Sequence, residues 1–199
     1  LKGRPRVVLN PNTLSRDGTV SAPIQSISHD GTMLAYGTSD AGSDWRTLHV
    51  RVVDSSRNMT ETLHWVKFSS PTWTHDNNGF YYSRYPEPAN KLADVNENQR
   101  LYYHEIGTPQ SKDRLVYQRP DRPKMSFGAS INDAGDTLII YASEGTDKRN
   151  RLYIQDLRTS SSEIVKVFDK GDAAYWFLGD KLVKDDRPFF TRLFTKKPK

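Results

Sequence analysis

Residues 27–36 read ISHDGTMLAY, and the same plan returns at residues 73–82 (WTHDNNGFYY) and 131–141 (INDAGDTLIIY). Each copy closes one apolar stretch, passes through a polar turn rich in Asp, Asn or Gly, and opens a second apolar stretch. Asp and Asn side chains bond their own backbone, and Gly or Asn tolerates positive φ, so such turns reverse the chain tightly between two strands. The pattern therefore predicts three β-hairpins.

A third strand that opens with arginine follows each hairpin, at residues 46–53 (RTLHVRVV), 100–106 (RLYYHEI) and 151–157 (RLYIQDL). Apolar and polar residues alternate in all three, as a half-buried strand requires. A fourth strand is predicted after each of them, at residues 61–66, 114–118 and 163–168. The repeating unit is thus four antiparallel strands.

The spacing of the turns indicates the architecture. Asp30 and Asp76 are 46 residues apart, and Asp76 and Asp133 are 57 apart, because residues 86–99 insert a polar stretch. A four-stranded unit of about 40–50 residues is typical of a β-propeller blade. The alternative is a β-sandwich of short strands, which has no reason to repeat its turn and arginine positions in register. We therefore predict an all-β fold, a partial β-propeller of about three to four blades.

The predicted domain covers residues 1–199, with blades at about 22–66, 70–118 and 127–168 and a partial blade at 173–199. Residues 6–10 are predicted to be the last strand of a preceding blade. The chain lacks an initiator Met and stops inside the fourth unit, so we expect it to be cut from a longer protein. A few blades leave apolar faces open, and we expect self-association through them.

Composition excludes several classes of function. There is no cysteine, which excludes disulfides and thiolate metal sites, and no apolar stretch approaches the roughly 20 residues of a membrane span. The net charge is +5, but it falls to +2 without the three lysines among the last four residues. The other cations are interleaved with acids, so we expect neither a nucleic-acid partner nor a membrane partner. We expect a cytoplasmic protein, with the periplasm as the alternative if a signal peptide was removed.

The sequence carries no clear catalytic or metal-binding motif. The Gly-x-Ser-x-Gly elbow that exposes the nucleophile of an α/β-hydrolase does not occur in the sequence. No two histidines have metal-ligand spacing, although His29 and His75 occupy equivalent turn positions. They are either a shared ligand pair or turn residues encoded by the repeat, and we favour the second interpretation. We expect no catalytic residue, metal or cofactor on this chain.

Several stretches resemble prolyl oligopeptidases, in order and at the spacing of that family. They include residues 34–39 (LAYGTS) with 42–45 (GSDW), 66–69 (VKFS) before 73–76 (WTHD), 101–104 (LYYH), and Glu144-Gly145 with Asn150-Arg151-Leu152. The resemblance covers residues 20–157 and weakens after about residue 160. It implies one part of a two-domain serine peptidase, in which a seven-bladed propeller caps an α/β-hydrolase domain and admits short peptides that are cleaved after proline.

The resemblance also assigns candidate roles. Phe68 matches a phenylalanine that lines the substrate pocket, with a buried strand aromatic as the alternative. Asp44 matches a position near the interface with the catalytic domain, where it would face a cation, with an ordinary turn residue as the alternative. Trp45 is expected to pack under the same loop.

The sequence departs from the family pattern at two pocket positions. Ser143 stands where many relatives carry an Arg that can contact the substrate terminus, so a preference for free termini is in doubt. Ser126 aligns with a pocket Met, and a shift of one residue would place Met125 there. We therefore include Phe68, Met125 and Ser143 as candidate substrate-binding residues. The rival hypothesis is a non-catalytic propeller that serves as a protein-interaction module.

Overall fold

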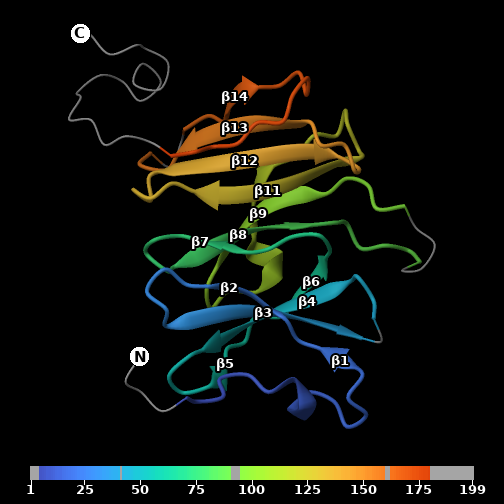
Figure 1. Ribbon diagram of the computed structural model, residues 1–199, viewed down its shortest axis with the longest axis vertical. Coiled ribbons are helices and arrows are strands. Elements are labelled where there is room, and N and C mark those ends of the chain that lie inside the picture. Colours follow the sequence, from blue (N-terminus) through green and yellow to red (C-terminus); the bar gives the residue numbers. More distant parts are fainter. Residues whose placement is uncertain (1–4, 41, 91–94, 160–161, 180–199) are drawn as a thin grey trace.

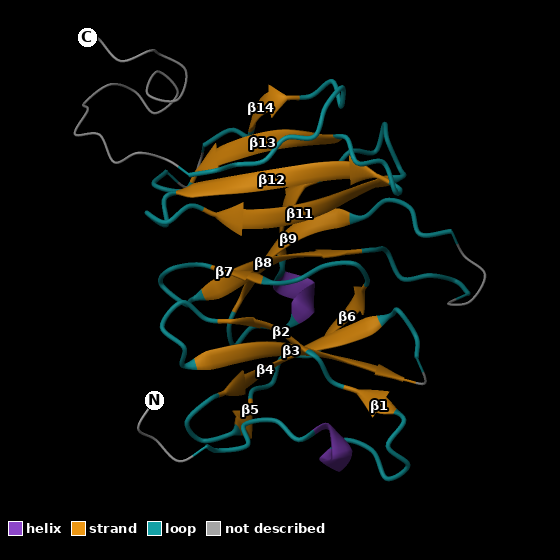
Figure 2. Cartoon of the chain, viewed as in Figure 1, coloured by secondary structure: helices purple, strands orange, loops and turns teal. Residues whose placement is uncertain are grey.

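The computed structural model describes residues 5–40, 42–90, 95–159 and 162–179, which form three antiparallel β-sheets and two 3₁₀ helices (Figures 1 and 2). The sheets follow one another along the chain and are stacked along the long axis of the molecule (Figure 1). This arrangement confirms the predicted fold class, all-β with four-stranded antiparallel sheets of the propeller-blade type.

The first sheet has four strand positions, two of which are interrupted. β3 (Met33–Asp40) and β4 (Arg46–Val52) form its centre. β1 (Val20–Ser21) and β2 (Ile24–Ile27) both pair with β3, while β5 (Arg57–Asn58) and β6 (Leu63–Val66) both pair with β4. Pro23 separates β1 from β2, because proline has no N–H to donate to a ladder. The 3₁₀ helix η1 (Pro11–Thr13) precedes this sheet.

The second and third sheets are each built in sequence order. The second contains β7 (Thr72–Trp73), β8 (Gly79–Arg84), β9 (Arg100–Glu105) and β10 (Arg114–Tyr117), with η2 (Gln110–Lys112) before its last strand. The third contains β11 (Met125–Ile131), β12 (Thr137–Glu144), β13 (Asn150–Asp156) and β14 (Val165–Phe168). The first strands of neighbouring sheets are in contact, β2 with β7 and β7 with β11.

Apolar clusters between the sheets join them. The cluster between the first and second sheets includes Leu48, Val50, Trp73 and Phe80. The cluster between the second and third includes Tyr81, Leu101, Phe127 and Ile140. Both faces of the second sheet are therefore buried against a neighbour, which is the packing that a repeat of stacked blades requires.

The described segments at the two ends of the stack are not strands. Residues 6–10 were predicted to be a strand, but they carry none; Val8 and Leu9 pack against the first sheet, and Arg6 donates to the carbonyls of Val53 and Asp54. Residues 173–179 are also without a strand, and Tyr175 and Phe177 lie on the open face of the third sheet. The rest of the predicted partial blade, residues 180–199, lies outside the described residues.

The sheets have two different ends. At the turn end, the three repeated turns meet: the His29 and His75 rings stack at 4.1 Å, and His75 lies against Gly135. At the loop end are the connections between the central strands and those between successive sheets, described at residues 42–45, 67–71, 85–90, 95–99, 118–124 and 145–149. The candidate residues of the sequence analysis all lie at the loop end.

Candidate functional site at the loop end

Long-range hydrogen bonds hold the loop end together across the three sheets. The Tyr85 N–H donates to the Trp65 carbonyl (3.0 Å), which ties the first sheet to the second. Gln99 is 2% exposed and bonds in two directions, because its Nε2 donates to the Lys67 carbonyl (3.1 Å) and its Oε1 accepts from the Phe127 N–H (2.7 Å). One side chain of the second sheet therefore bridges the first sheet to the third.

Asp44, Trp45, Lys67 and Phe68 form one cluster at this end. The Lys67 Nζ lies 3.6 Å from Asp44 Oδ2, and it lies 5.2 Å from the ring centroids of both Trp45 and Phe68. Trp45 also contacts Trp65 and Tyr85 edge-on, at 6.1 and 5.9 Å between ring centroids. The structure thus brings together Asp44 and Trp45, which the sequence assigned to the domain interface, and Phe68, which it assigned to the substrate pocket.

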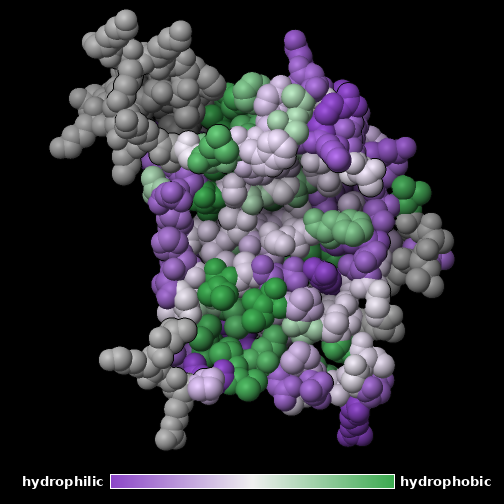
Figure 3. All heavy atoms as spheres, viewed as in Figure 1, coloured by the Kyte–Doolittle hydropathy of each residue, from purple (hydrophilic) through white to green (hydrophobic). Residues whose placement is uncertain are grey.

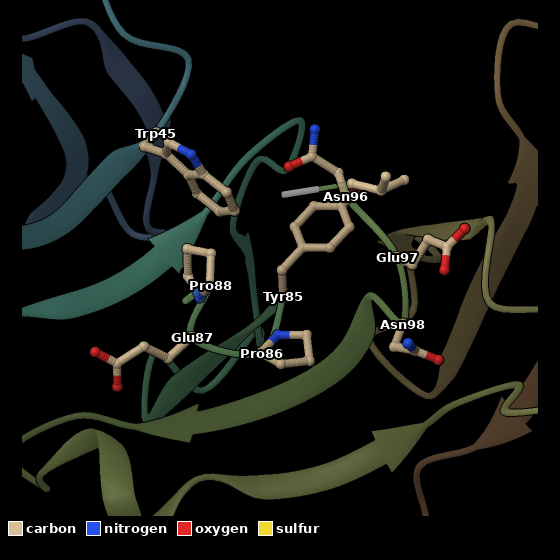
Figure 4. Close-up of a pocket in the computed structure, with 9 residues that line it drawn as sticks. Trp45, Tyr85, Pro86, Glu87, Pro88, Asn96, Glu97 and Asn98 are labelled. Atoms are coloured by element: carbon tan, nitrogen blue, oxygen red, sulfur yellow. The ribbon is translucent and has the colours of Figure 1, made fainter. Parts of the chain in front are cut away.

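A pocket of about 290 Å³ opens beside this cluster (Figure 4). The rings of Trp45, Tyr85 and Pro88 face a common space, and Pro86 lies below Tyr85. The carboxylates of Glu87 and Glu97 lie on opposite sides of the pocket, and Val95, Asn96 and Asn98 complete its lining. Burial raises the pKa of the Tyr85 hydroxyl, so this ring stays neutral at physiological pH. Aromatic and proline rings that line one pocket are a surface on which extended peptides can pack.

Phe68 is not a buried strand aromatic, the structural alternative considered above. Its side chain is 68% exposed, and its backbone has a φ of 54°, which a bulky residue rarely adopts. An exposed aromatic ring in a strained backbone conformation is a feature that often accompanies function. Asp44 is exposed as well, with its side chain at 65%, so it is accessible to a partner despite its contact with Lys67.

Met125 and Ser143 lie on neighbouring strands of the third sheet but differ in exposure. Met125 is 1% exposed in the cluster between the second and third sheets, because alternation along β11 turns its side chain inward. Ser126 faces the other way, and its Oγ is 3.5 Å from the Ser143 carbonyl. In this structure only Ser143 of the two candidates is partly open to solvent, so Met125 would support the surface from beneath.

Two arginines contact Glu144, the residue that follows Ser143. Arg122 and Arg151 both contact Glu144 Oε2, at 3.4 and 3.7 Å. Arg151 also donates to the Asp169 carbonyl, and its side chain is nearly buried, whereas that of Arg122 is partly exposed. This edge therefore retains a cation, which comes from the connection before β11 and not from β12.

Other features of the chain do not add to this site. Among the described residues, no group of three or more His, Asp or Glu side chains could hold a metal ion. The stacked His29 and His75 belong to the turn end, where His75 packs on Gly135. Within the same described ranges, no helix has the length and apolar character needed to cross a membrane.

Sequence reasoning missed the residues that assemble the site. Lys67, Tyr85 and Gln99 act through contacts with residues about 20 to 40 positions away, and no local pattern marks them. The only available signal was that Lys67 lies inside the run at residues 66–69 that carried the family resemblance.

Fold and site together define an all-β protein of stacked propeller-type blades with an exposed aromatic and charged loop end. Residues 1–187 match the family described as prolyl oligopeptidase, N-terminal β-propeller domain, and the chain belongs to that family.

Known proteins with similar sequences carry the same family name. The chain is 36% identical over 185 residues to prolyl oligopeptidase A of Amanita bisporigera, a match that covers 80% of this chain and 24% of the relative. It is 34% identical over 187 residues to a prolyl endopeptidase of Elizabethkingia meningoseptica, covering 88% and 26%. The chain therefore spans about a quarter of the length of these relatives.

Solved structures agree with the sequence matches. Prolyl oligopeptidase B from Galerina marginata, bound to a 35mer hydrolysis and macrocyclization substrate, superposes with a TM-score of 0.80 at 30% identity. That match covers 86% of this chain and 26% of the other. A structure from a study of two prolyl endopeptidases and their inter-domain dynamics gives a TM-score of 0.72 at 35% identity, covering 82% and 22%.

Proposed function

We propose that this chain is the gating, substrate-filtering propeller part of a proline-specific serine oligopeptidase. In this proposal it supplies a pocket wall, while an α/β-hydrolase domain of the same parent protein carries the Ser-Asp-His triad. The observation that carries the proposal is the loop-end cluster, in which the exposed Phe68 ring lies one residue from the Lys67–Asp44 ion pair. Family membership and the names of the relatives support the same assignment.

The proposal gives the loop-end residues two tasks. Phe68 and Ser143 contact the side chains of a short proline-containing peptide, with Met125 as their support. Asp44 and Trp45 meet the catalytic domain, where the exposed Asp44 carboxylate pairs with a cation. No residue of this chain forms or breaks a covalent bond in the reaction.

The test uses the product of the intact gene and a series of proline-containing peptides of increasing length. We expect kcat/KM to fall steeply for long peptides in the wild type, and we expect Phe68→Ala to lower kcat/KM for short ones. Residues 1–199 alone should leave a proline-containing chromogenic peptide intact between pH 6 and 9. Turnover by the purified chain, or equal kcat/KM at all lengths, would overturn the proposal.

A second candidate, a non-catalytic interaction module, is favoured by one feature of the surface. Figure 3 shows apolar surface over the first sheet, where Ile24 and Ile27 of β2 are 52% and 57% exposed. One simple observation distinguishes the two functions. A Gly-x-Ser-x-Gly segment downstream in the intact gene supports the peptidase, and its absence supports the interaction module.

We also propose that open sheet faces lead the isolated chain to associate with itself. On the third sheet, Ile139, Leu152 and Ile154 form an apolar cluster that Tyr175 and Phe177 cover in part. Apolar faces of this kind are normally covered by a neighbouring blade. Light scattering of the purified chain should show species larger than a monomer, and a monodisperse monomer would contradict this expectation.

A further inference from the structure

Two aromatic residues near the start of the connection between β6 and β7 have unusual backbone conformations. Trp65 has a φ of 63° and Phe68 a φ of 54°. Both values lie in the left-handed region, where a residue other than glycine is strained. The two strained residues enclose Val66 and Lys67, so contacts made by this short segment must hold it in place.

Lys67 makes the contacts that hold this segment in place. Its side chain is only 13% exposed, and its ammonium group lies at 5.2 Å from both the Trp45 and the Phe68 ring centroids. The same group contacts Asp44 Oδ2 at 3.6 Å, and the Lys67 carbonyl accepts from Gln99 Nε2. Lysine side chains are usually well exposed, so this burial between two rings requires a reason.

Stability alone does not supply that reason. Asp44 is 65% exposed, and an ion pair with so exposed a partner contributes little to stability. Phe68 gains little from burial, because most of its side chain faces solvent. The ammonium group is, however, the contact that the Phe68 ring and the Trp45 ring share, and cations over aromatic faces restrict ring orientation.

We propose that Lys67 is a positioning residue that fixes the exposed Phe68 ring as a binding surface for an apolar side chain of a peptide. The ammonium group occupies one side of the ring, and the exposed remainder can receive the ligand. Asp44 keeps the ammonium group over Trp45. Asp44, which is proposed to meet the catalytic domain, therefore also helps to orient Phe68, which is proposed to contact the substrate. The peptide part of this inference rests on the proposed function.

The experiment places 4-fluorophenylalanine at position 68 of the 199-residue chain and compares Lys67→Met, Lys67→Arg and the control Lys124→Met by ¹⁹F NMR. Methionine keeps the length of lysine and removes its charge, whereas arginine keeps a cation that can stack on rings. Lys124 is exposed in the connection before β11 and has no ring or ion-pair contact among those found for the described residues.

We expect Lys67→Met to move the ¹⁹F resonance toward its unfolded value, while the melting temperature changes by less than about 2 °C. Lys67→Arg should restore the shift, and Lys124→Met should leave it unchanged. A resonance that stays in place in Lys67→Met overturns the inference, and so does a shift that appears only together with loss of thermal stability.

A proline-containing peptide is then titrated into each labelled chain. Lys67→Met should weaken binding about fivefold, the equivalent of roughly one cation–π contact, and Lys67→Arg should recover most of the loss. If the peptide leaves the wild-type ¹⁹F signal unperturbed, the proposed peptide contact fails. The positioning role is judged by the first measurement, so the two failures are distinguishable. Equal peptide affinity of Lys67→Met and wild type would overturn the binding part of the inference.

Discussion

The turn end and the loop end of the sheets are stabilised in different ways. At the turn end most bonds are local: Asp30 Oδ1 accepts from the Thr32 N–H, Asp76 Oδ1 from the Asn78 N–H, and Asn132 Oδ1 from the Thr137 N–H. One long-range bond joins two turns there, from the His29 N–H to Asn77 Oδ1. At the loop end, Gln99 bonds to residues 32 and 28 positions away. The repeat thus specifies the blades through short-range turns, and the features that distinguish this chain lie where the repeat is broken.

Among the substitutions that compare the two ends, the largest effect is expected at the turn end, where Gly79 begins β8. A Cβ atom there would lie 2.2 Å from the His104 carbonyl oxygen and 2.5 Å from the Tyr103 hydroxyl. Gly79→Ala should therefore lower the free energy of unfolding by about 3 kcal/mol, since backbone cannot move aside as a flexible side chain can. Urea denaturation measures the change.

Gly128 provides the matched control for this substitution. It lies within β11, and a Cβ atom would meet nothing within 4 Å. Gly128→Ala should change stability by less than about 0.5 kcal/mol. If the two variants are equally destabilised, close packing at the turn end is not what holds the blades.

The next effect is expected at the loop end, from Gln99→Ala. The substitution leaves the Lys67 carbonyl and the buried Phe127 N–H without their partner, which should cost about 2 kcal/mol. Gln118→Ala, at an exposed position before β11, is the control and should be neutral. Both variants are measured by the same urea denaturation. If Gln99→Ala does not change the free energy of unfolding, the loop end is not tied to the third sheet through this side chain.

A smaller effect is expected from His49, which lies in β4 between the two ends. Burial lowers the pKa of its imidazole below the ordinary value of 6.5. The unfolded chain then binds the proton more tightly, so the His49 contribution to stability is present above about pH 6.5 and is lost as the pH falls toward the folded pKa. The difference in urea midpoint between pH 7.5 and 5.5 should be smaller in His49→Gln than in wild type. An unchanged difference would assign the pH dependence to other groups.

The same contrast explains what could be predicted from the sequence. The hairpin turns and the strands after them repeat, and β3, β8 and β12 follow the turns as expected because Asp, Asn and Gly act within a few residues. The class of fold follows from that repetition. The interruption of the first sheet at Pro23 has a local cause, the missing proline N–H, whereas the absence of a strand at residues 6–10 reflects packing against the first sheet, which a local pattern does not report.

The site was predicted only in part, for the same physical reason. Motif resemblance named Asp44, Trp45 and Phe68 as candidates, and in the structure they lie in one cluster. The inward direction of Met125 could have been read from alternation along its strand, because Phe127 is buried on the same side. The roles of Lys67 and Gln99 could not be predicted from a local pattern. Lys67 contacts Asp44 and Trp45 from another loop of its own sheet, and Gln99 bonds to the two neighbouring sheets.

The smallest effect on stability is expected from Phe68→Gly, although it removes a large apolar side chain. The ring is 68% exposed, so little burial is lost, and glycine adopts a φ near 54° without the strain that phenylalanine carries there. The free energy of unfolding should change by less than about 0.5 kcal/mol. Phe80→Ala, at a fully buried position, should cost about 3–5 kcal/mol in the same urea assay. A loss above about 1 kcal/mol in Phe68→Gly would mean that the ring supports the blade, and that the loop end, like the turn end, is built for stability.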